Sequence, residues 1–270
     1  MLRRPMLGPL ILRNSAALRR SDCWHHADLV SLQNQKLNNL LKVVESNAGF
    51  IREYYDQKGV NLKDIDIVSK IHLLPVLNKR IIKESGDNFL LSKHRLVPKL
   101  VSWTGGSTGE PLKVTKNLTS AIMGEASLLR FRCWHGIGIG SRGVVVKLSG
   151  NITILGRVGQ YLDRAISLNA FHGKTCDWKK TVQRLHRWQP EYLTGYPSTL
   201  ESLAIACKPG LIRSRKIVVT GETLLPEQRE LFEQVFGGCV VRYYGSNEVS
   251  ALGFECEHGR LHVKDRKSVV

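Results

Sequence analysis

Apolar residues follow two different spacings along the chain. Between Leu29 and about Gln57 they recur at helical spacing, with a break near 47–49, which predicts helices. From residue 98 onwards, short apolar and β-branched runs alternate with helical segments. The expected strands are 96–101, 112–115, 142–147, 191–194, 215–220 and 239–243, and the expected helices are 118–134, 177–188, 197–206 and 226–236. This alternation predicts an α/β fold with a mostly parallel sheet flanked by helices, in which ligands bind at the carboxyl ends of strands.

The same pattern divides the chain into three regions. Residues 1–28 form a basic segment without an acidic residue in its first 21 positions, a bias shared with organelle transit peptides. Its apolar run over 7–12 is interrupted by glycine and proline and lacks a convincing cleavage site, so we expect a poorly ordered or peripheral segment. Residues 29–97 are expected to form helices that cover one side of a sheet, and residues 98–270 the α/β part.

Composition narrows the class of protein. At 270 residues and 42% hydrophobic residues, the chain can bury a real core in one large or two modest domains. Its purely apolar runs are far too short to cross a bilayer. The net charge of +17 suits an anionic ligand such as ATP or coenzyme A, and because the basic residues are scattered, we expect no nucleic-acid partner. Six dispersed cysteines without a Cys-x-x-Cys pair are typical of a reduced, cytoplasmic protein.

The stretch from Ser102 to Pro111 is the first candidate for chemistry. It places three glycines and four hydroxyl side chains between two expected strands. Glycine has no Cβ to block close approach, so backbone N–H groups and hydroxyls could surround a phosphate here. A P-loop is excluded, because Gly109 is followed by Glu110 and Pro111 instead of Lys-Ser/Thr opening a helix. Taken alone, the loop could equally be a flexible turn.

A second candidate follows the expected strand at 239–243. The sequence from Tyr244 to Glu248 supplies an aromatic ring, a glycine, a small hydroxyl and a carboxylate, which are the groups needed to stack a purine, approach a phosphate and hold Mg²⁺. The preceding strand also ends in a glycine-acid turn, at Gly221 and Glu222. Three such turns at strand ends of one α/β unit favour a nucleotide site.

Together these residues resemble the adenylate-forming superfamily, and within it the phenylacetate–CoA ligase and CapK-like branch associated with capsular polysaccharide gene clusters. Thr104 to Pro111 is similar to the phosphate loop of that superfamily, and Tyr244 to Glu248 to its Tyr-Gly-x-Ser/Thr-Glu motif. Further similarity lies at 73–75, 193–198 and 221–224, so the resemblance covers the chain from about residue 30 to its end. The fold implied is the large N-terminal domain of an adenylate-forming enzyme.

The resemblance also implies the ligands and the residues that bind them. A small carboxylic acid would attack ATP to give an acyl-adenylate, and a thiol, typically coenzyme A, would then displace AMP. The residues implied to hold the phosphates are Thr104, Gly106, Ser107, Thr108 and Gly109, with Thr108 also catalytic. Gly221 and Glu222 would border the adenine and Tyr244 would stack on it, within the motif that also contains Gly245 and Ser246. Glu248 would be catalytic through Mg²⁺.

Cys256 and His262 add a metal signal. Their spacing could supply half of a structural zinc site, and members of the phenylacetate–CoA ligase branch look similar here, with further cysteine ligands downstream. Only residues 263–270 follow in this chain, so two reduced side chains without Zn²⁺ are the alternative.

The chain departs from the family pattern in three places. Gly105 and Asn247 stand where relatives carry a hydroxyl, which predicts weaker ATP binding or slower adenylation. The sequence also stops at Val270, before the ribose-binding aspartate, the hinge and the lysine-bearing lid domain of the family. From the sequence alone we therefore expect a C-terminally truncated ligase, with a non-catalytic nucleotide-binding remnant as the alternative and a basic nucleic-acid-binding protein as the weakest one.

Overall fold

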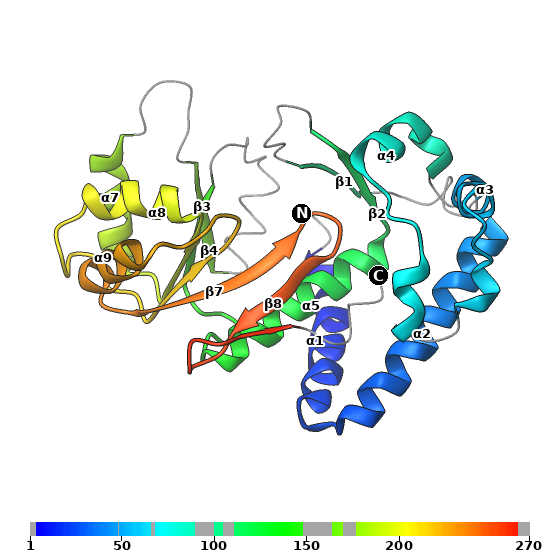
Figure 1. Cartoon of the computed structure of the whole chain (residues 1–270). Helices are drawn as coiled ribbons and strands as arrows, with labels where there is room; N and C mark the ends of the chain where they lie inside the picture. The colour runs from blue at the N-terminus through cyan, green and yellow to red at the C-terminus, as the bar shows by residue number, and fades with distance from the viewer. Residues whose placement is uncertain are drawn as a thin grey trace. The chain divides into compact units, whose positions relative to one another are not determined.

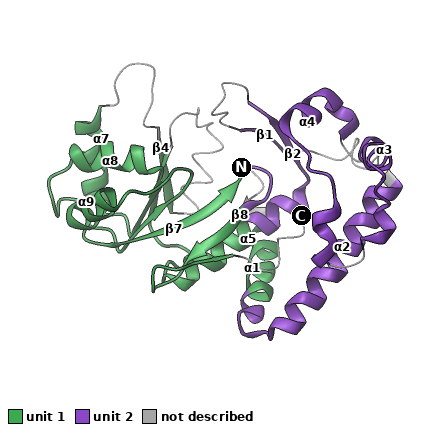
Figure 2. Ribbon diagram, in the orientation of Figure 1, with its two compact units in different colours: residues 1–18, 125–246, 251–263 green, residues 19–124, 247–250, 264–270 purple. Residues whose placement is uncertain are grey.

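A computed structural model of the chain describes residues 4–47, 49–65, 68–89, 100–104, 111–147, 164–169 and 177–263. It contains two compact units (Figure 2). Unit 1 comprises residues 1–18, 125–246 and 251–263, and unit 2 comprises residues 19–124, 247–250 and 264–270. The domain limits expected from the sequence group the chain differently and stay a prediction. Among the described residues, no helix is long and apolar enough to span a membrane.

Unit 1 is built on a seven-stranded sheet with the order β4-β3-β5-β6-β7-β8-β9 (Figure 1). The strands are β3 (Gly143–Lys147), β4 (Ala165–Asn169), β5 (Tyr192–Gly195), β6 (Lys216–Val219), β7 (Cys239–Ser246), β8 (Ser250–Glu255) and β9 (Leu261–Val263). The first five strands in this order pair in parallel, and β9 pairs antiparallel with β8. Because β5, β6 and β7 are parallel neighbours, the turns that follow them lie at one edge of the sheet.

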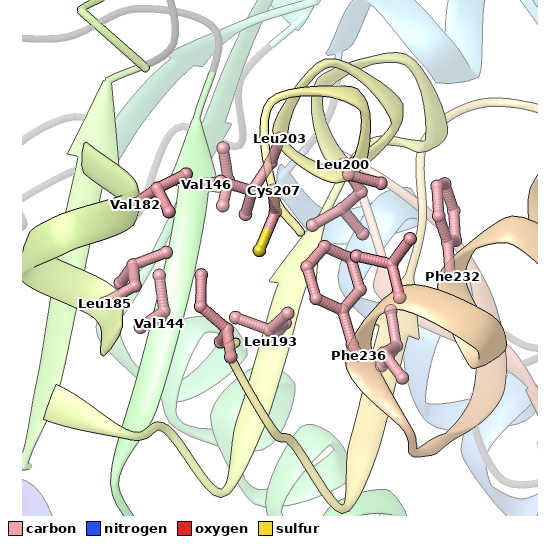
Figure 3. Packing of buried hydrophobic residues seen from close by; sticks show 14 of the residues in the cluster. Val144, Val146, Val182, Leu185, Leu193, Leu200, Leu203, Cys207, Phe232 and Phe236 are labelled. Carbon is pink, nitrogen blue, oxygen red and sulfur yellow. The ribbon is translucent and has the colours of Figure 1, made fainter. Parts of the chain in front are cut away.

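The strand residues alternate between two apolar layers. On one face, the helices α7 (Trp178–Trp188), α8 (Pro197–Ile205) and α9 (Pro226–Phe236) pack on the sheet, and Figure 3 shows the side chains that meet there. In β6, Ile217 and Val219 belong to this layer, whereas Val218 belongs to a second layer with Phe131 of α5 (Leu118–Trp134). Both layers exclude water, which accounts for the continuous β-branched run in β6.

Local sequence signals explain where these helices begin and end. The side chain of Asp177 accepts a hydrogen bond from the Lys180 amide at 3.1 Å, and so caps α7. Proline occupies the first turn of α8 and of α9, where its missing N–H costs nothing. Gly237 ends α9 in the left-handed region at φ +72°.

Helix α1 (Arg4–Arg20) lies in the segment expected to be poorly ordered or peripheral. Residues 4–20 of that segment are helical. Leu18 and Ser15 are 4% and 3% exposed, so the C-terminal half of α1 is held by burial of its small and apolar side chains.

Unit 2 is mainly helical. Its regular elements are α2 (His26–Asn47), α3 (Gly49–Gln57), α4 (Lys79–Ser85), β1 (Leu100–Trp103), β2 (Lys113–Lys116), and the 3-10 turns η1 (Ser21–Cys23), η2 (Leu62–Asp64), η3 (Val68–Leu73) and η4 (Gly86–Phe89). The break near 47–49 falls between α2 and α3, whose apolar faces meet around Leu37 and Tyr55. β1 and β2 form an antiparallel pair, with Leu100 opposite Lys116 and Trp103 opposite Lys113.

His135, directly after α5, makes the stability of unit 1 depend on pH. Its Nε2–H donates to the Glu255 carbonyl at 2.8 Å and its ring packs edge-on against Phe131. Desolvation lowers the pKa of His135 below its ordinary value. Below about pH 6.5 the unfolded chain therefore binds a proton that the folded chain excludes, and the free energy of unfolding falls with the pH. We expect the urea midpoint to drop between about pH 7.5 and 5.5. A His135→Gln chain with an equal drop would contradict this assignment.

Candidate functional site

The turn after β6 requires glycine at position 221. Gly221 lies in the left-handed region at φ +84°, and a Cβ at this position would overlap the ring of Tyr196. The Thr220 amide donates to the Gly195 carbonyl at 3.3 Å, so the turn stays paired with the end of β5. The aromatic ring of Tyr196 can therefore lie directly against the backbone of the turn.

Glu222 accepts two hydrogen bonds from the first turn of α8. Its Oε2 accepts from the Ser198 amide at 3.0 Å and its Oε1 from the Ser198 hydroxyl at 2.9 Å. Both bonds satisfy donors at the start of a helix, where negative charge is also favoured by the helix dipole. Glu222 therefore links the end of β6 to α8. Ser198, which sequence reasoning did not count among the site residues, belongs to the Tyr-Pro-Ser sequence that opens this helix.

Two consecutive tyrosines near the end of β7 differ in burial. Tyr243 hydrogen-bonds the side chain of Thr220, and burial raises the pKa of its hydroxyl. Tyr244, the next residue in the strand, is 63% exposed. Because side chains alternate along a strand, the two rings point to opposite faces of the sheet. Gly245 and Ser246 complete β7 and are half-buried.

The described part of the glycine-rich loop is its anchor in unit 2. The Thr104 amide donates to the Leu112 carbonyl at 3.0 Å, and the Leu112 amide donates to Thr104 Oγ1 at 2.9 Å. This pair closes the β1–β2 hairpin across the loop. The four remaining residues expected to bind phosphate lie outside the described residues: Gly106, Ser107, Thr108 and Gly109.

Asn247 has a role in unit 2 that sequence reasoning missed. It begins the three-residue turn between β7 and β8, and its Nδ2 donates to the Trp103 carbonyl at 3.0 Å. The residue before the loop anchor Thr104 is thereby tied to the turn that carries Glu248. The sequence signal was an amide, which can donate, at the position where the resembled motif has a hydroxyl.

The metal predictions differ in how well the described residues fit them. Glu248 is an exposed carboxylate, and Mg²⁺ at nucleotide sites is held by one or two carboxylates together with phosphate oxygens, so this residue fits the expected ion. Cys256 begins the turn between β8 and β9, whereas His262 lies within β9, opposite Phe254. In the described part of the chain, no group of three or more His, Cys, Asp or Glu side chains could hold a metal ion. The zinc site therefore stays a prediction supported by two residues.

No protein-family model matches the chain. In sequence, the chain is 26% identical over 246 residues to Protein CapK of Staphylococcus aureus, a match that covers 87% of this chain and 54% of CapK. The chain thus spans about half the length of the curated relative it matches. The sequence similarity confirms the predicted resemblance to the CapK-like branch.

In structure, the chain is similar to 2-hydroxyisobutyryl-CoA ligase. A structure of that ligase in the postadenylation state with R3-HIB-AMP matches with a TM-score of 0.69 and 18% identity, covering 86% of this chain and 53% of the ligase chain. A second, with 2-HIB-AMP and CoA in the thioesterification state, matches with a TM-score of 0.67 and 18% identity, covering 89% and 54%. These matches confirm the predicted α/β fold with a mostly parallel sheet flanked by helices.

Proposed function

We propose that this chain, similar to CapK in sequence and to an acyl-CoA ligase in fold, binds ATP and a carboxylic acid in an AMP-forming acyl-activating reaction. The observation that carries the proposal is the position of the Tyr244–Glu248 motif. Tyr244 to Ser246 form the carboxyl end of β7 and Glu248 lies in the turn after it, beside the Gly221–Glu222 turn that follows the parallel neighbour β6. Ligands of open α/β sheets bind at this edge.

The residue roles follow the motifs. Tyr244, with its exposed ring, would stack on the adenine, and the Gly221–Glu222 turn would border the base. Thr104 and the loop that follows it would hold the phosphates, and Glu248 would hold Mg²⁺, which neutralises phosphate charge. The Tyr196 and Ser198 contacts keep the adenine-bordering turn in place.

The chemistry proposed requires positioning more than a reactive side chain. An oxygen of the substrate carboxylate attacks the α-phosphorus, the bond to the bridging oxygen breaks, and pyrophosphate leaves with that electron pair. The sulfur of a thiol, proposed to be coenzyme A, then attacks the acyl carbon and AMP leaves. Such steps are accelerated mainly by alignment and by neutralising charge on the phosphates. A cytoplasmic location and a link to capsular polysaccharide synthesis are parts of the same proposal.

Carboxylate-dependent exchange of pyrophosphate into ATP tests the reaction. Exchange that depends on both Mg²⁺ and an added acid would support adenylation by this chain. Thermal stabilisation by Mg-ATP without exchange would favour nucleotide binding alone. The absence of both stabilisation and exchange would overturn the proposal. Binding to DNA that weakens steeply with salt would favour the nucleic-acid alternative instead.

Tyr244→Ala is expected to weaken Mg-ATP binding by about tenfold, because stacking of a base on an aromatic ring is worth ~1–3 kcal/mol. Isothermal titration with Mg-ATP measures the change. Trp24→Ala removes another exposed aromatic ring, remote in sequence from every motif, and is expected to leave the affinity unchanged. Equal affinities of wild type and Tyr244→Ala would remove Tyr244 from the site.

One observation favours nucleotide binding without turnover as a second candidate function. Asn247 stands where relatives carry a hydroxyl near the α-phosphate, and its amide is committed to the Trp103 carbonyl. A donor held by the protein is less available to a phosphate. Asn247→Thr is expected to raise the exchange rate if this position limits adenylation, and an unchanged rate would remove the reason for the second candidate.

A further inference from the structure

Unit 1 contains a cavity of about 410 Å³ on the α5 face of its sheet. This volume lies in the range of small-molecule sites. Leu128, Leu129 and Phe131 of α5 line one wall, and Val145 and Val218 of the sheet line the other. Residues 8, 11 and 12 of α1 also line it. The cavity is separate from the exposed ring of Tyr244, which points to the other face of the sheet.

The α5 wall of the cavity has an acidic residue at one end and a basic residue at the other. Glu125, Leu128, Leu129 and Arg132 all line it, at the spacing that places residues on one helix face. Seven residues of helix separate the acidic end from the basic end, a distance of roughly 10 Å. A ligand lying along this face would meet the Arg132 guanidinium at one end, the Glu125 carboxylate near the other end, and apolar side chains between them.

The acidic end lies towards the candidate nucleotide site. Arg132 hydrogen-bonds Tyr192, the first residue of β5, so Glu125 lies towards the carboxyl end of that strand. Tyr243, which immediately precedes the Tyr244–Glu248 motif, also lines the cavity. Glu125 has further interactions within the protein. Thr194, near the end of β5, lines the cavity as well. The reacting carboxyl group of an acid would therefore leave the cavity at this end, next to the strand ends.

The basic end offers donors to an anion. Arg132 Nη1 donates to the Tyr192 hydroxyl at 3.3 Å. Arg132 Nε is buried, and no hydrogen-bond partner for it exists among the described residues. A buried donor without a partner costs free energy that a bound acceptor would recover. A guanidinium is also the group best shaped to hold a carboxylate.

Gly143 keeps the Tyr192 hydroxyl beside Arg132. Tyr192 is 5% exposed, and a Cβ on Gly143 would overlap the hydroxyl end of its ring. The two residues face each other in the paired strands β3 and β5. The basic end is therefore built by the packing of the sheet and does not depend on a flexible surface side chain.

We propose that this cavity selects a dicarboxylic acid, holding it lengthwise with its second carboxylate at Arg132 and Tyr192 and its activated carboxyl group at the Tyr243 end. This assignment rests on the proposed acyl activation, which it deepens by naming the class of acid. The apolar wall at Leu128 and Leu129 suits the methylene chain between the two carboxylates.

Binding of matched acids to the full chain tests the assignment. Adipate and suberate are titrated calorimetrically beside hexanoate and octanoate, with and without Mg-ATP. Each dicarboxylate is expected to bind at least about tenfold more tightly than its monocarboxylate, since a charge-assisted hydrogen bond is gained. Arg132→Gln is expected to abolish this preference, measured as the ratio of the dicarboxylate affinity to the monocarboxylate affinity. The matched control, Arg184→Gln on exposed α7 surface, is expected to keep it.

Tyr192→Phe removes a single hydroxyl and is also expected to reduce the preference for dicarboxylates. This second variant tests the assignment if Arg132→Gln does not fold. A preference for monocarboxylates, a preference that survives both substitutions, or no binding of any acid overturns the assignment. Failure of the proposed function is seen separately. If wild type binds no Mg-ATP but still prefers dicarboxylates through Arg132, adenylation fails and the cavity assignment stands.

Discussion

Replacing Gly221 by alanine is expected to lower the free energy of unfolding by about 2–5 kcal/mol and to weaken Mg-ATP binding at least tenfold. Alanine in the left-handed region costs ~1–2 kcal/mol, and displacement of a packed ring adds ~1–3 kcal/mol. Here the Cβ would overlap the ring of Tyr196 at φ +84°. Moving that ring would shift the turn that is proposed to border the adenine. Urea denaturation and calorimetric titration with Mg-ATP measure the two effects.

Gly210→Ala is the matched control for this substitution. Gly210 has nearly the same backbone angle, φ +76°, but a Cβ there would meet nothing within 4 Å. It should therefore show only the backbone cost of ~1–2 kcal/mol and no loss of nucleotide affinity. If the two alanine variants were equally stable and bound Mg-ATP equally well, the contact between Gly221 and Tyr196 would have no part in the site.

Glu255→Ala is expected to destabilise the protein by about 2–3 kcal/mol, because it removes two hydrogen bonds to a buried carboxylate and leaves the Arg242 amide without its acceptor. Glu255 is 3% exposed at the end of β8. Its Oε1 accepts from Arg229 of α9 at 2.8 Å, and its Oε2 accepts from the Arg242 amide of β7 at 2.8 Å. One carboxylate thus joins a helix and two strands. Urea denaturation measures the change in the free energy of unfolding.

Glu84→Ala serves as the comparison for Glu255→Ala. Glu84 pairs with Arg80 one helical turn away on α4, at 3.8 Å, and both side chains are exposed. Exposed pairs of this kind contribute ~0.3–0.5 kcal/mol, so a small change is expected. A loss from Glu255→Ala no larger than the loss from Glu84→Ala would show that Arg229 and Arg242 are satisfied by water instead.

The fold was predictable because its strands and helices differ in local pattern. The run at 217–219 is β-branched throughout, and the structure buries it on both faces as part of β6. The proline at 226 and the glycine at 237 bound α9, as residue preferences at helix ends dictate. The N-terminal helix was missed because its arginines and interrupting glycine and proline resemble a targeting segment more than a packed helix.

The candidate site was predictable only where a motif keeps its residues together in sequence. The pairing of Glu222 with Ser198 joins residues 24 apart, and that of Asn247 with Trp103 joins residues 144 apart. Arg132 and Tyr192 are 60 residues apart and meet only when α5 packs on the sheet. The available sequence signal was an arginine and a glutamate, Arg132 and Glu125, on an otherwise apolar helix face. Without the strand order, the sequence did not show which residue Arg132 contacts.

Gly221 with Tyr196 and Glu222 with Ser198 form two adjacent contacts between the same two short segments. A substitution in either segment is therefore tolerated only if the other accommodates it, so we expect the two segments to change together among relatives. The same coupling limits protein engineering. A β6 turn grafted from a protein of similar fold should function in this chain only when the residues that open α8 are transferred with it.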